Sequence, residues 1–140
     1  MGYVAGMPAN ELRHGSGSSE EMALPCDRIS PRRARRFIAK LVVGRAHAAD
    51  IELLTSELVT NAVVHARTAA RMCVEVGYRT VRVEVSDASS EAAAPRSPDV
   101  AGGRGLHLVE LLSDRWGVDL RPTGKVVWFE IDAAVLPPST

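Results

Sequence analysis

The sequence predicts an α+β domain, and three observations support this. Residues 30–44 and 50–66 repeat apolar residues with the period of a helix. Two later pairs of segments, 71–78 with 80–87 and 115–120 with 125–132, have the length and composition of strands joined by short turns. The length of 140 residues, 46% of them hydrophobic, suits one domain with one core.

Composition excludes several classes of function. Lysine and arginine number 17 and so do aspartate and glutamate, so the whole molecule has no electrostatic attraction for nucleic acid. Cys26 and Cys73 belong to no CxxC or Cys/His pattern, which argues against a zinc site and a disulfide framework. No apolar run is long enough to span a bilayer, and no secretory signal is visible. We therefore expect a cytoplasmic protein without direct contact to nucleic acid or membrane.

The chain is expected to begin with a tail and an edge strand. Residues 1–20 are rich in glycine and serine and show no apolar period, which predicts a disordered tail. Residues 21–27 form a candidate strand, and Pro25 places it at the edge of a sheet.

The first helix is expected over residues 30–44. Ser30 is the candidate N-cap, Pro31 suits the first turn and Gly44 is a good stop. Seven basic residues and no acidic one lie between Arg28 and Arg45. A solvated surface is the favoured interpretation, and a docking face for an acidic partner or for nucleic acid is the alternative.

The second helix carries the most informative pattern. Glu57, Asn61 and His65 follow one another at intervals of four residues, so in an α-helix they form one row. A carboxylate can take a proton or orient a nucleophile, and an amide oxygen suits Mg²⁺. The row predicts a nucleotide and metal site, or else the polar border of an ordinary amphipathic helix.

Two downstream features favour the nucleotide site. Residues 80–87 alternate valines with polar residues and end at Asp87, a carboxylate at a strand end. After an irregular loop over residues 88–102, glycines at 102, 103 and 105 precede a helix over residues 107–112. Such glycines let backbone N–H groups approach a phosphate, although the P-loop and GxGxxG patterns are absent.

Four motifs in fixed order resemble a known family. They are SELVTNAVVHA, VEVSD, GGRGLHLVELLSDRWGV and GKVVWFE. Together they resemble the Bergerat-fold ATP-binding domain of gyrase, sensor histidine kinases and anti-sigma-factor serine kinases, most closely the small stand-alone kinases of the last group. The resemblance covers residues 21–134 and leaves 135–140 as a loose end. It implies a two-layer α/β sandwich with a mostly antiparallel sheet covered by helices on one face.

The resemblance also implies roles for particular residues. Asn61 would bind Mg²⁺ that bridges the phosphates of ATP, and Glu57 would be the general base for a substrate hydroxyl. Asp87 would accept a hydrogen bond from the adenine amino group. The residues implied at the phosphates are His65, Gly103, Arg104, Gly105 and Leu106. The chain lacks the glycines that usually follow the aspartate, which predicts that adenine is held more loosely.

Two functions follow from the resemblance. The first is a Mg²⁺/ATP-dependent serine/threonine kinase that phosphorylates an anti-anti-sigma-type antagonist and regulates transcription by binding a sigma factor. The alternative is a nucleotide-binding module that sequesters a protein partner without chemistry. Glu57 favours the first, and the missing glycines after Asp87 favour the second. Relatives often dimerise, so a homodimer is a further possibility.

Overall fold

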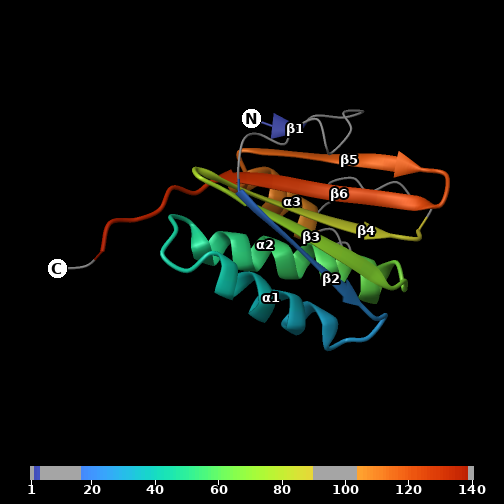
Figure 1. The fold of residues 1–140 in the computed structure, drawn as a ribbon. Helices are drawn as coiled ribbons and strands as arrows, with labels where there is room; N and C mark the ends of the chain where they lie inside the picture. The colour runs from blue at the N-terminus through green and yellow to red at the C-terminus, as the bar shows by residue number, and fades with distance from the viewer. Residues whose placement is uncertain (1, 4–16, 90–103, 139–140) are drawn as a thin grey trace.

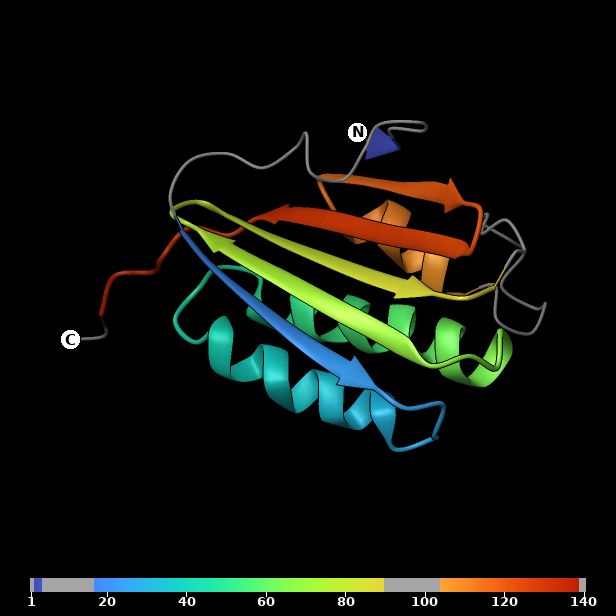
Figure 2. The same cartoon turned by 45° about the vertical axis from the view of Figure 1, so that its right-hand side comes forward.

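The computed structural model describes residues 2–3, 17–89 and 104–138. It contains a sheet with strand order β1-β5-β6-β4-β3-β2, and the helices lie on one face of that sheet (Figures 1 and 2). All neighbouring strands from β5 to β2 are antiparallel, and only the short β1 pairs in parallel, with β5. The expected α+β fold, with helices on one side of a mostly antiparallel sheet, is therefore confirmed.

The bounds of the elements lie close to those expected from the sequence. The strands are β1 (Gly2–Tyr3), β2 (Gly17–Leu24), β3 (Ala70–Gly77), β4 (Thr80–Asp87), β5 (Arg115–Arg121) and β6 (Gly124–Asp132). The helices are α1 (Ser30–Leu41), α2 (Ala48–Thr60), the π-helix η2 (Asn61–His65) and α3 (Arg104–Leu112). Most of the loop expected over residues 88–102 lies outside the described residues, as does Gly103.

Most of the expected N-terminal tail, residues 1 and 4–16, lies outside the described residues, but the part that is described differs from the expectation. The described residues of that segment lie in strands: Gly2–Tyr3 pairs with β5, and Gly17–Leu24 pairs with β3 along its whole length. The edge position of the candidate strand is correct, but the strand starts at Gly17 rather than at residue 21. Its polar residues concealed it, because an edge strand is stabilised by backbone pairing and needs little apolar surface.

The start of α1 also differs from the expectation. Ile29 is the N-cap, and its side chain makes no capping bond. The hydroxyl of Ser30 instead donates a hydrogen bond of 2.7 Å to the carbonyl of Pro25, and the carboxylate of Asp27 accepts the Ile29 N–H at 2.9 Å. Pro31 sits in the first turn as expected, and Gly44 has a left-handed φ of 77° after the helix end.

The core lies between the sheet and the helices. Alternate residues of the central strands point to the helices, and β4 and β6 contribute Val81, Val83, Val85, Val127, Phe129 and Ile131. From α2 and η2 the expected stripe of Ile51, Leu54, Leu58 and Ala62 is fully buried. Since each buried aliphatic side chain contributes about 1.5–3 kcal/mol, this layer accounts for most of the hydrophobic stabilisation.

The opposite face of the sheet has a second buried cluster. The Arg82 guanidinium lies 4.2 Å from the centre of the Trp128 ring, and its Nη1 donates to Glu130 at 3.0 Å. Glu130 also accepts from Arg115 at 2.7 Å. This hydrogen bond raises the pKa of Arg115 above its ordinary value, although burial opposes it. The alternation in β4 therefore does not separate a buried face from an exposed one, because Arg82 is only 3% exposed.

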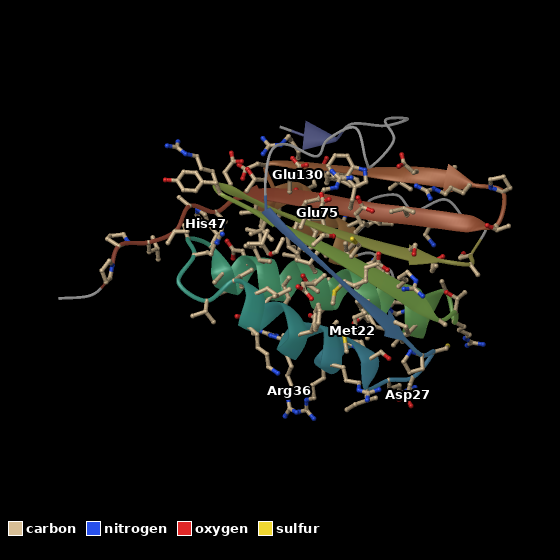
Figure 3. All side chains as sticks on the ribbon, in the orientation of Figure 1. Met22, Asp27, Arg36, His47, Glu75 and Glu130 are labelled. Carbon is tan, nitrogen blue, oxygen red and sulfur yellow. The ribbon has the colours of Figure 1, made fainter. Side chains whose placement is uncertain are left out.

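The basic residues of α1 point away from the core. The side chains of Arg32, Arg33, Arg36 and Lys40 are exposed, and Figure 3 shows Arg36 extending from the helix away from the sheet. One ion pair links this helix to α2, between Arg35 and Glu52 at 3.6 Å.

Candidate functional site

The last turn of α2 and the start of η2 supply two polar side chains that have no partner among the described residues. Glu57 and Asn61 are half-buried, and within the described part of the chain neither side chain has a hydrogen bond or an ion pair. They lie next to the apolar stripe of α2, which packs on the sheet and fixes the direction of this helix face. A carboxylate and an amide are therefore left available to a ligand.

The helix widens at Asn61. Residues Asn61–His65 form a π-turn, in which the Ala66 N–H donates to the Asn61 carbonyl at 2.8 Å, five residues back. A π-turn holds more residues than an α-turn, so the expected α-helical row ends at Asn61. The side chain of His65 is exposed. Single π-turns inside helices are frequent at functional sites, which marks this helix end as the candidate site.

The π-turn lies at the sheet end where β4 stops. Elements η2 and β4 are in contact, and α2 is in contact with α3. Figure 2 shows the end of the green helix α2–η2 and the arrowhead of β4 at the same end of the molecule. The fold thus brings the Glu57–Asn61 segment to the strand that ends at Asp87.

Residues expected at the glycine-rich turn are only partly described. Arg104 and Gly105 open α3. Leu106 is 4% exposed and belongs to the core cluster. Its side chain is therefore a packing group, and any contact with a phosphate would come from its backbone.

Asp87 is held in a buried ion pair. Its carboxylate oxygens lie 3.0 and 3.2 Å from Lys125 Nζ, and Oδ1 also accepts the Ser89 N–H at 2.7 Å. The Asp87 and Lys125 side chains are only 4% and 8% exposed. The two residues are register partners on β4 and β6. This pairing could not be read from the sequence, because strand register brings together residues that are far apart in the chain.

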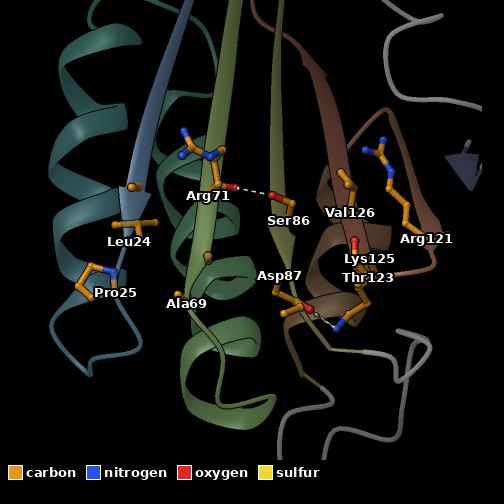
Figure 4. Close-up of a pocket in the computed structure, with 14 residues that line it drawn as sticks. Leu24, Pro25, Ala69, Arg71, Ser86, Asp87, Arg121, Thr123, Lys125 and Val126 are labelled. Atoms are coloured by element: carbon orange, nitrogen blue, oxygen red, sulfur yellow. Dashed lines mark hydrogen bonds and ion pairs between the residues drawn. The ribbon is translucent and has the colours of Figure 1, made fainter.

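A pocket of about 690 Å³ borders this ion pair (Figure 4). Its wall consists of the ends of β2, β3 and β4 and the β5–β6 hairpin, and the lining residues include Ala23, Ala70, Arg71, Ser86, Asp87, Arg121, Thr123 and Lys125. The size lies within the range of small-molecule sites. Glu57, Asn61, His65 and Leu106 do not line this pocket. Of the expected site residues, Asp87 is therefore the one that this pocket contains.

The described residues include no group of three His, Cys, Asp or Glu side chains that could hold a metal ion by themselves. Nucleotide-bound Mg²⁺ needs only one or two protein oxygens beside phosphates and water, and the unpartnered Asn61 amide fits that requirement. No helix in the described ranges is long and apolar enough to cross a membrane.

Known proteins show two similarities. Residues 27–131 match the family model of the histidine kinase-like ATPase domain. The crystal structure of the RsbU and RsbW domains of Rv1364c from Mycobacterium tuberculosis is similar to 86% of this chain, with a TM-score of 0.63 and 19% sequence identity. This chain covers 35% of that one, and at this identity the likeness shows the fold alone. No curated protein matches the chain.

Proposed function

Because this chain belongs to the histidine kinase-like ATPase family, we propose that it binds ATP with Mg²⁺ and phosphorylates a serine or threonine of a protein partner. The observation that carries the proposal is that α2, which bears Glu57, and η2, which begins at Asn61, both contact β4, the strand that ends at Asp87. Among the described residues, neither Glu57 nor Asn61 has a side-chain partner.

Each residue has a chemical role in this proposal. Asp87 accepts a hydrogen bond from the amino group of adenine, and Asn61 supplies the amide oxygen for Mg²⁺. Glu57 takes the proton from the substrate hydroxyl, whose oxygen attacks the γ-phosphorus while ADP leaves. Catalysis of this kind depends mostly on positioning and charge stabilisation, so a helix anchored in the core is a suitable support.

The phosphates of ATP are assigned to the residues that the family resemblance places there. These residues are His65, Gly103, Arg104, Gly105 and Leu106. His65 is exposed and can reach outward, while Leu106 would contribute only its backbone N–H. The start of α3 adds the favourable electrostatics of a helix N-terminus for an anion.

The proposed partners come from the motif resemblance to anti-sigma-factor kinases, and the likeness in fold to an RsbW-containing protein agrees with them. We propose an anti-anti-sigma-type antagonist as the phosphoryl acceptor and a sigma factor as the second partner, which places the chain in the cytoplasm and in transcription regulation. A nucleotide-binding module that only sequesters its partner is the second candidate. It is favoured by the sequence Asp87-Ala88-Ser89, which lacks the usual glycines.

Transfer of labelled phosphate distinguishes the two candidates. The full chain is incubated with γ-³²P-ATP, Mg²⁺ and any small antagonist of the anti-anti-sigma type that is encoded beside it. The kinase proposal predicts a labelled antagonist with wild type and with Glu52→Ala, a control that removes a carboxylate from the same helix. It predicts none with Glu57→Ala, although this variant still binds ATP. A wild-type chain that binds ATP and transfers nothing favours the sequestering module.

A further inference from the structure

The Asp87–Lys125 pair leaves one hydrogen-bond acceptor and one donor unused. Asp87 Oδ1 already accepts from Ser89 and lies near Lys125, whereas Lys125 is the one contact of Oδ2 within the described ranges. An ammonium group has three donors, and a carboxylate oxygen can accept two bonds. Lys125 has no other partner among the described residues, so one of its N–H groups is open beside an open lone pair of Asp87.

The pair is also rigid. Asp87 and Lys125 face each other across two antiparallel strands that are paired from Thr80 to Asp87. Gly124, directly before Lys125, has φ of 152°, and a Cβ at that position would overlap the carbonyl oxygen of Asp87. The close backbone approach holds the lysine at the carboxylate. Little side-chain freedom is then left to lose when a ligand binds.

The open groups border a space that a planar base can occupy. Both residues line the pocket of about 690 Å³, whose wall also carries small apolar residues such as Ala23, Ala70 and Ala88. Figure 4 shows the two side chains directed toward each other at the ends of their strands. A flat ring that enters here would meet the acceptor and the donor side by side.

We propose that Lys125 donates a hydrogen bond to N1 of adenine while Asp87 accepts one from the N6 amino group. The pair, rather than the aspartate alone, thus reads the polar edge of the base. The proposal rests on the proposed function, which supplies ATP as the ligand. Adenine presents a donor at N6 next to an acceptor at N1, whereas guanine presents an acceptor at O6 next to a donor at N1. Guanine therefore meets both protein groups with the wrong polarity.

The test compares ATP with 1-deaza-ATP, in which a C–H group replaces N1 and the N6 amino group remains. Affinities of the full chain are measured by titration calorimetry. If Lys125 donates a charge-assisted hydrogen bond to N1, wild type should bind 1-deaza-ATP about tenfold more weakly than ATP. In Lys125→Met this ratio falls to less than about twofold, because the donor is gone. The matched control Arg121→Met removes another cation of the same pocket and keeps the tenfold ratio.

If Lys125→Met does not fold, a comparison of two other variants answers the same question. Asp87→Asn retains Lys125 and the tenfold ratio, whereas Asp87→Asn/Lys125→Met carries no unpaired charge and loses the ratio. Equal affinity of wild type for both nucleotides would overturn the role of Lys125, and so would a ratio unchanged by loss of the lysine. A wild-type chain that binds neither nucleotide would instead overturn the proposed function itself.

Discussion

Replacement of Asp87 by alanine is expected to destabilise the fold as well as the site. The substitution removes the carboxylate that contacts Lys125 at 3.0 and 3.2 Å and Ser89 N–H at 2.7 Å. It leaves an ammonium group that is only 8% exposed without its counter-ion. Breaking a buried pair in this way costs roughly 3–5 kcal/mol. Since the adjoining pocket admits water to Lys125, we expect the lower end, about 3 kcal/mol.

A double-mutant cycle measures this coupling. The free energies of unfolding of wild type, Asp87→Ala, Lys125→Met and the double variant are obtained from urea unfolding followed by circular dichroism. The double variant has no buried charge to compensate, so it should regain about 2 kcal/mol relative to Asp87→Ala. An exposed ion pair would instead give a loss of unfolding free energy below about 1 kcal/mol for Asp87→Ala and no coupling between the two substitutions. That result would refute the reasoning that the pair is buried and held.

Two further substitutions test the buried Glu130 cluster and the start of β6, each with a control. Glu130→Gln removes a buried charge that holds Arg82 and should lower the free energy of unfolding by about 3 kcal/mol, whereas Asp132→Asn at an exposed ion pair should cost less than about 1 kcal/mol. Equal effects would contradict burial of the Glu130 cluster. Gly124→Ala places a Cβ against the Asp87 backbone and should cost at least about 2 kcal/mol, while Gly44→Ala, with open space around it, should cost about 1 kcal/mol for its positive φ alone. Urea unfolding measures both pairs, and a Gly124→Ala variant as stable as Gly44→Ala would show that the hairpin is not tightly held.

The sequence was sufficient to predict most elements, because their signals are local. The apolar period of α2 and the alternation in β4 follow directly from burial of one face, and both elements were placed within a few residues. The first half of strand β2 was missed, since its pairing with β3 is made by backbone groups and its residues from Gly17 to Glu21 are exposed. Backbone pairing leaves no pattern in the side chains.

The candidate site was less accessible to prediction. Spacing alone suggested that Glu57, Asn61 and His65 form one row, but a π-turn widens the helix at Asn61. None of the residues in this segment is of a type that predicts a π-turn. Lys125 was not among the residues that the sequence assigned to the site, whereas the structure pairs it with Asp87 through strand register. Such contacts depend on how distant segments pack, which one sequence does not reveal.

Binding of ATP with and without Mg²⁺ tests the central claim most directly. Titration calorimetry of the full chain should show one ATP bound per chain, with affinity that falls at least about tenfold when EDTA removes Mg²⁺. Asn61→Ala should bind equally weakly in both conditions and remain folded, while Ser56→Ala, a control on the same helix, should retain the Mg²⁺ effect. A wild-type chain that shows no ATP binding, or an Asn61→Ala variant with the full Mg²⁺ effect, would contradict the account.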